Sequence, residues 1–190
     1  MEAFLVATGI VALAEVGDKT QLLALVLAAR FRRPWPIIAG ILVATLANHA
    51  AAAALGAWLT TLIGPDSLRW ILGLSFLAMA VWIVIPDKMD DAAVVPRHGV
   101  FLTTLICFFL AEMGDKTQIA TVALAAKYQA LVAVVLGTTA GMMIANIPAV
   151  FLGERIALAL PARLIHGVAA AIFAFVGVLT LLGAGERLGL

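Results

Sequence analysis

The sequence predicts an all-α polytopic membrane protein with six transmembrane helices, arranged as two inverted three-helix repeats. Three observations predict this fold. The chain of 190 residues is 64% hydrophobic and 12% charged, with a mean hydropathy of +1.13, whereas soluble domains are about 25% charged. Apolar stretches of about 20 residues, long enough to cross a bilayer, recur along the chain. One charged motif occurs in both the first and the fourth of these stretches.

Six segments are expected to form membrane-spanning helices. Prolines and charged residues separate several of them, as at 30–34, 64–66 and 154–163, and such residues favour helix ends and turns. Lys127 marks a tight turn after the fourth segment. The predicted helices are 3–29, 36–62, 68–85, 99–126, 130–153 and 164–183.

The distribution of lysine and arginine predicts the orientation in the membrane. Six spans place both termini on one side, which carries three basic residues, while the opposite side carries seven. Cytoplasmic loops are enriched in lysine and arginine. We therefore expect both termini to be external and the central loop to be cytoplasmic.

An internal repeat divides the chain into related halves. Residues 15–30 align with 112–127 at an offset of 97 without a gap, and nine of the sixteen positions are identical. The same offset pairs Gly40 with Gly137. Three helices per half invert the second half, an architecture found in many secondary transporters. The predicted units are a first three-helix repeat at 1–85, a cytoplasmic linker at 86–98 and a second three-helix repeat at 99–190.

The repeated motif places charged side chains inside apolar spans. It reads EVGDKTQ from Glu15 and EMGDKTQ from Glu112. An ionised group at the bilayer centre costs about 2.5–3.5 kcal/mol on insertion scales. On an ideal helix Glu15, Asp18 and Lys19 share one face, and Gly17 lies nearly opposite, where it suits close packing or a local break. The alternative is that the charged residues form a buried ion pair with a purely structural role. Buried ion pairs stabilise a protein only weakly, so this role would not explain why a costly motif occurs twice. The duplication therefore favours one shared site.

The side chains of the motif suit a hard divalent cation. Four carboxylates and two lysines leave a charge of −2, which one divalent cation or two protons would balance. Carboxylate, amide and hydroxyl oxygens bind Mg²⁺, Ca²⁺ or Mn²⁺, and crowded, desolvated carboxylates also compete for protons near neutral pH. The expected metal-binding residues are Glu15, Asp18, Glu112, Asp115, Gln21, Gln118 and Asn146. The expected supporting residues are Lys19, Lys116, Thr20, Thr117, Asn48, His49, Gly17 and Gly114.

Other polar positions within the spans carry weaker expectations. Asn48 and His49 are either interhelical hydrogen-bonding groups or lining groups of the site, with His49 as a proton relay. On an ideal helix Thr20 and Thr117 project away from the face of the glutamates. Pro148 is expected to break the fifth helix and free a carbonyl for the ion.

The pattern E-x-G-D-K-T, present twice in six spans, resembles the cation/proton antiporter family that contains bacterial manganese exporters. Golgi and chloroplast-membrane Mn²⁺/Ca²⁺ transporters belong to the same family. The resemblance covers nearly the whole chain, and both copies of the motif match without a departure. It implies a transporter and not an enzyme, with Mn²⁺ or Ca²⁺ moved out of the cytosol against protons and no resident cofactor.

The expected function is therefore export of Mn²⁺ in exchange for protons. The alternatives are a Ca²⁺/H⁺ antiporter, an exporter of small solutes such as basic amino acids, a passive cation channel and a non-transporting assembly factor. The expected partners are the divalent cation, protons and the lipid bilayer, and a homodimer is left open. A net charge of +1 indicates no nucleic acid.

Overall fold

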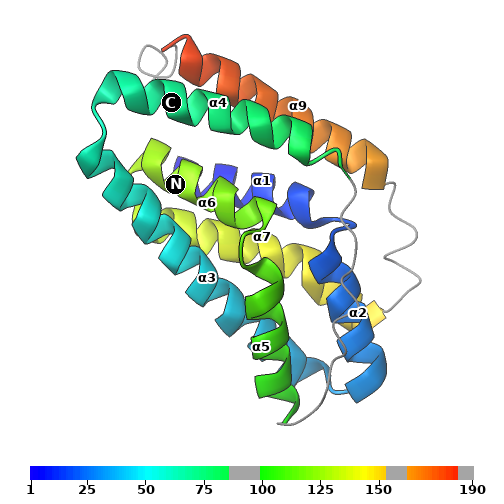
Figure 1. Cartoon of the computed structure of the whole chain (residues 1–190). Coiled ribbons are helices and arrows are strands. Elements are labelled where there is room, and N and C mark those ends of the chain that lie inside the picture. Colours follow the sequence, from blue (N-terminus) through cyan, green and yellow to red (C-terminus); the bar gives the residue numbers. More distant parts are fainter. Residues whose placement is uncertain (86–98, 153–161, 184–190) are drawn as a thin grey trace.

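The computed structural model describes residues 1–85, 99–152 and 162–183, and the regular structure in these ranges is entirely helical (Figure 1). The predicted linker, 86–98, lies outside the described residues. The described helices are α1 (Glu2–Glu15), α2 (Lys19–Phe31), α3 (Pro34–Leu62), α4 (Pro65–Trp82), α5 (Val100–Glu112), α6 (Lys116–Tyr128), α7 (Leu131–Leu152) and α9 (Ala162–Leu181).

Four of the six predicted helices are observed as single helices close to their expected bounds, as α3, α4, α7 and α9. Both α3 and α4 begin at a proline, a few residues earlier than expected, because proline suits the first turn of a helix. The expected break at Pro148 is wrong, since α7 continues through this residue. Ala149 and Val150, which follow it, are buried against neighbouring helices, and such packing lets a proline remain inside a helix.

The predicted first and fourth helices are each broken in two. The first is interrupted between Glu15 and Lys19, and the fourth between Glu112 and Lys116. At both interruptions the glycine of the motif has a positive φ, 80° at Gly17 and 74° at Gly114, a conformation that glycine adopts without steric cost. The local break is therefore confirmed. Figure 1 shows α2 turning steeply away from α1, and α6 from α5.

Three helices in the described ranges are long and apolar enough to cross a membrane by length and composition. They span Pro34–Leu62, Leu131–Phe151 and Arg163–Leu181, and Val100–Glu112 is a shorter apolar helix. Many of their large hydrophobic side chains are exposed, as at Leu42, Ile144 and Phe175. An all-helical chain with this surface is typical of a helical membrane protein.

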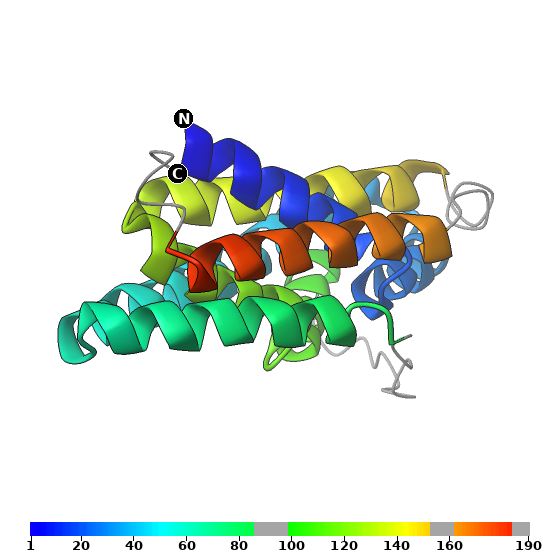
Figure 2. The ribbon, with the colours of Figure 1, turned by 90° about the horizontal axis from the view of Figure 1, so that it is seen from above.

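The two halves interlock around the breaks. Helix α7 packs along α1 and α2, while α3 packs along α5 and α6. The long helix that follows the broken helix in each half therefore packs against the broken helix of the other half. Helices α4 and α9 lie side by side and cover α1 and α6 (Figures 1 and 2).

Close contact between α1 and α7 makes Gly141 intolerant of a side chain. A Cβ atom at this position would lie 2.6 Å from the Thr8 carbonyl oxygen and 2.8 Å from the Ala12 nitrogen. We expect Gly141→Ala to lower the free energy of unfolding by about 1–3 kcal/mol, because backbone atoms must move apart. Gly9→Ala on α1 is the matched control, since nothing lies within 4 Å of its added Cβ atom. Thermal unfolding in detergent measures both, and equal midpoints would contradict this packing.

Candidate cation site

Both motifs have the same backbone conformation at the helix break. Asp18 and Asp115 lie at the N-terminal ends of α2 and α6, with φ and ψ of −81° and 169°, and −78° and 165°. A carboxylate at this end of a helix is stabilised by the helix dipole. Because the backbone is not helical here, Glu15, Asp18 and Lys19 are not placed by the face of one ideal helix, and that part of the prediction is wrong.

The glutamines that end the motifs satisfy backbone groups that the breaks leave free. Gln21 Oε1 accepts a hydrogen bond from the Gly17 nitrogen at 2.9 Å, and Gln118 Oε1 accepts one from the Gly114 nitrogen at 2.7 Å. The amide group of Gln21 also donates to the Ala145 carbonyl at 3.0 Å. Each glutamine therefore stabilises its own break, and Gln21 additionally ties the first motif to α7.

The carboxylates of the two motifs lie together. One carboxylate oxygen from each of Glu15, Asp18 and Asp115 lies within 4.8 Å of the others, and all three residues are buried. Glu15 is also close enough to Glu112 for their charges to repel. Helices that are far apart in the sequence thus bring four acidic side chains into one region, as the duplication predicts.

The lysines of the motifs pair across the two halves. Lys19 Nζ lies 3.1 Å from Asp115 Oδ1, and Lys116 Nζ lies 4.0 Å from Asp18 Oδ1. The two pairs are unequal, because the side chain of Lys19 is 27% exposed and that of Lys116 is 3% exposed. Lys116 also donates a hydrogen bond to the Ile85 carbonyl at 3.0 Å.

Glu112 has polar neighbours on α3. Thr45 Oγ1 donates to Glu112 Oε1 at 2.8 Å, and His49 Nε2 lies 4.0 Å from Glu112 Oε2. Asn48 Nδ2 donates instead to the Phe109 carbonyl at 3.0 Å, and so joins α3 to α5. Of the two expected α3 residues, His49 therefore lies beside a carboxylate and Asn48 bonds to backbone.

The remaining expected residues occupy different environments. Thr20 Oγ1 donates to Glu15 Oε2, so the expectation that it points away is wrong, because the break redirects the chain. In the described part of the chain, Thr117 Oγ1 has no hydrogen-bond partner. Asn146 Nδ2 donates to the carbonyl and to the sulfur of Met142, both at 3.0 Å. Among the described residues, Asn146 Oδ1 and Glu15 Oε1 accept no hydrogen bond.

Two contacts at this site were not anticipated from the sequence. Thr45 shares a helical face with Asn48 and His49 through i, i+3 and i+4 spacing, a signal that could have revealed it. His166 at the start of α9 lies near a predicted span end and carries no such signal. Its Nε2 atom lies 2.6 Å from the Val16 carbonyl, which the break at Gly17 leaves without a helical partner.

Comparison with known sequences assigns the family. The sequence model described as "Divalent cation/proton antiporter GDT1" matches residues 3–91 and, separately, residues 100–187. The chain belongs to the GDT1 family. This family comprises transporters and not enzymes, so the chain is a multi-pass helical membrane protein of a cation-transporting family.

Two known proteins are similar over most of the chain. A protein of Vibrio cholerae serotype O1 named "Putative manganese exporter" is 53% identical over 171 residues, covering 90% of this chain and 86% of its own length. A "GDT1-like protein" of Synechocystis is 30% identical over 180 residues, covering 82% of this chain and 87% of its own length. No solved structure matches.

Proposed function

We propose that this chain is a secondary active transporter that exports a divalent cation, Mn²⁺ first, from the cytoplasm in exchange for protons. One observation carries the proposal: oxygens of Glu15, Asp18 and Asp115, from both motifs, lie within 4.8 Å of one another. Hard oxygen ligands suit Mn²⁺ and Ca²⁺. The printed name of the Vibrio cholerae relative favours Mn²⁺.

The cation and protons would compete for the same acidic side chains. Glu15, Asp18 and Asp115 would bind the cation directly, and Glu112 lies close enough to be sensitive to its charge. Protons would replace the cation because crowded carboxylates in a low dielectric are unstable when all are ionised. The paired lysine ammonium groups, which already lie against Asp115 and Asp18, would compensate part of the charge after the cation leaves.

Other expected site residues would support these carboxylates. Gln21 and Gln118 would hold the two breaks open, because each accepts the freed glycine N–H group. Asn146 would add an amide oxygen, since its Oδ1 atom is buried and accepts no hydrogen bond from the described residues. His49 would serve Glu112 as a proton relay, because its Nε2 atom lies 4.0 Å from Glu112 Oε2.

We further propose six membrane crossings in two inverted halves, 1–85 and 99–190, with each broken helix as one crossing. The separate matches of the family model to both halves support the division. The direction of packing supports the inversion. Gly137 of α7 approaches Phe4 of α1, and Gly141 approaches Thr8, so α7 runs parallel to α1. If the second half had the same orientation as the first, α7 would run antiparallel to α1.

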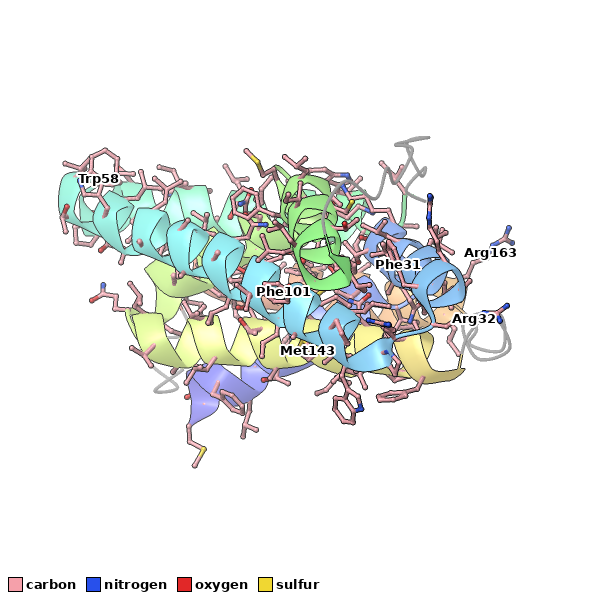
Figure 3. All side chains as sticks on the ribbon, turned by 90° about the horizontal axis from the view of Figure 1, so that it is seen from below. Phe31, Arg32, Trp58, Phe101, Met143 and Arg163 are labelled. Atoms are coloured by element: carbon pink, nitrogen blue, oxygen red, sulfur yellow. The ribbon has the colours of Figure 1, made fainter. Side chains whose placement is uncertain are left out.

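The proposed location is a bacterial inner membrane, with both termini outside. Figure 3 shows Arg32 and Arg163 at one end of the molecule and Trp58 at the opposite end. The N-terminus and the end of α9 lie at the same end of the molecule, opposite the end where α9 begins (Figures 1 and 2). An end rich in arginine is typical of the cytoplasmic face. Association into a homodimer stays a prediction.

Transport can be tested with purified protein in vesicles. We expect vesicles with an acidic interior to accumulate Mn²⁺, because outward proton movement drives the cation inward through an antiporter. A protonophore that collapses the pH gradient should stop net accumulation. Protein-free vesicles are the control, and Mn²⁺ is measured by a quenched internal dye.

The same assay separates the alternatives. Accumulation of Ca²⁺ in preference to Mn²⁺ would indicate a Ca²⁺/H⁺ antiporter, and accumulation of arginine a solute exporter. Rapid equilibration that does not depend on the pH gradient would indicate a channel. If no substrate moves and the purified protein binds no metal, the transport proposal fails and an assembly role gains support.

A further inference from the structure

The two motif glutamates have different neighbours on the opposite half. Glu112 accepts a hydrogen bond from Thr45 of α3 at 2.8 Å. The residue 97 positions after Thr45 is Met142 of α7, and the residue 97 positions before Glu112 is Glu15. Suppose that α7 meets α1 in the same register in which α3 meets α5. The Met142 thioether then lies beside Glu15, in the position that the Thr45 hydroxyl has beside Glu112.

Contacts of two glycines establish this register. A Cβ atom on Gly40 of α3 would meet Phe101 and Thr104 of α5. A Cβ atom on Gly137 of α7 would meet Phe4 and Ala7 of α1. Every residue in the second contact is related to its counterpart in the first by the offset of 97, so the two helix pairs have the same register.

A hydrogen bond independently places this part of α7 at the first motif. Gln21 Nε2 donates to the carbonyl of Ala145 at 3.0 Å. Ala145 lies between Met142 and Asn146 in the sequence, and one turn of helix separates these two residues. The first motif and the 142–146 segment of α7 are therefore direct neighbours.

Met142 is fully buried, and its sulfur has a polar contact. Its Sδ atom accepts a hydrogen bond from Asn146 Nδ2 at 3.0 Å. That bond turns the amide so that Asn146 Oδ1, like Glu15 Oε1, accepts no hydrogen bond among the described residues. By the shared register, the Met142 sulfur and these two oxygens lie on the Glu15 side of the site.

We propose that Met142, oriented with Asn146, is a specificity-determining residue that disfavours Ca²⁺ and Mg²⁺ relative to Mn²⁺ at the Glu15 side of the site. Ca²⁺ requires six to eight oxygen ligands, and Mg²⁺ requires a regular octahedron of oxygens. A thioether is a soft donor that these hard ions use poorly, whereas Mn²⁺, as a first-row transition-metal ion, also binds at sites that mix oxygen with nitrogen or sulfur ligands. A methionine in place of threonine therefore removes one hard ligand. This inference rests on the proposed transport of a divalent cation.

The decisive variant, Met142→Thr, gives α7 the threonine that α3 has at the matching position, Thr45. We expect Met142→Thr to raise the affinity for Ca²⁺ relative to Mn²⁺ by about tenfold, the scale on which residues around a metal change its binding. Equilibrium titration of the purified protein with each cation gives this ratio, and inhibition of Mn²⁺ uptake by Ca²⁺ in vesicles gives it a second time.

Two further variants control for packing. Met142→Leu keeps the apolar volume without the sulfur, and it should weaken Mn²⁺ binding without strengthening Ca²⁺ binding. Met143→Thr makes the same exchange on the adjacent residue (Figure 3), which packs against an apolar cluster, and it should leave the ratio unchanged.

The outcomes distinguish this inference from the transport proposal. A wild-type protein that neither binds nor transports Mn²⁺ defeats the transport proposal. A wild type that transports Mn²⁺, together with an unchanged cation ratio in Met142→Thr, overturns the role of Met142 alone. If Met142→Thr does not fold, Met142→Leu decides, because unchanged Mn²⁺ affinity in that variant overturns the role as well.

Discussion

Replacing Glu15 with glutamine is expected to abolish Mn²⁺ transport and to weaken Mn²⁺ binding by at least about 100-fold, more than the loss of a supporting residue causes. Glu15 is fully buried and belongs to the three-carboxylate group with Asp18 and Asp115. Glutamine has nearly the same shape and still offers Thr20 an acceptor, so the fold should persist. It lacks the negative charge that attracts the cation and the site that takes up a proton in exchange.

A matched control exists on the same helix. Glu2→Gln removes an exposed carboxylate from the first turn of α1 and should leave transport unchanged. Uptake in acid-inside vesicles and equilibrium metal titration measure both variants. Wild-type transport by a Glu15→Gln, Glu112→Gln double variant would show that the cation does not bind at the motifs.

Replacing Lys116 with methionine is expected to destabilise the protein by about 3 kcal/mol or more, the usual cost of removing one partner of a buried ion pair. The side chain of Lys116 is almost fully buried near Asp18 and also donates to the Ile85 carbonyl. Lys19→Met should cost less, because the Lys19 side chain is 27% exposed and water screens its pair with Asp115, whereas Lys116 also gives up its hydrogen bond to the Ile85 carbonyl. The two lysines occupy identical motifs, so this difference would arise from tertiary structure alone.

Thermal unfolding in detergent would measure the two lysine variants. Lys127→Met, at the other end of α6, controls for the loss of a lysine from this helix. A second substitution, Asp18→Asn, should restore part of the stability of Lys116→Met because it removes the uncompensated negative charge. A larger loss for Lys19→Met than for Lys116→Met would contradict the asymmetry of the site.

Local patterns in the sequence were sufficient for the class of protein and for the main acidic residues. Length and hydropathy predict helices wherever about 20 apolar residues follow one another, and α3, α4, α7 and α9 were predicted close to their bounds. The repetition of E-x-G-D-K-T-Q in both halves predicted that its carboxylates would meet. The helix positions follow from residues that are close in sequence, and the meeting of the carboxylates follows from a repeat that the sequence itself shows.

The errors lie where a local rule admits two outcomes. A glycine within a helix suits either close packing or a turn, and only the positive φ of Gly17 and Gly114 decides between them. Once the helix is broken, angles on an ideal helix no longer apply, so Thr20 reaches Glu15. Pro148 illustrates the reverse case, because packing from neighbouring helices keeps α7 continuous through a residue that commonly ends a helix.

Composition, hydropathy and the repeated motif were enough to identify the membrane class, the family motif and the acidic side chains that must be neutralised inside the protein. Tertiary structure alone decided which lysine pairs with which aspartate, which of the two motif lysines is buried, and which residue of α3 donates a hydrogen bond to Glu112. The physical reason is that charge and hydropathy are properties of single residues and short segments. Pairing, burial and ligand geometry depend instead on contacts between helices that lie far apart in the chain.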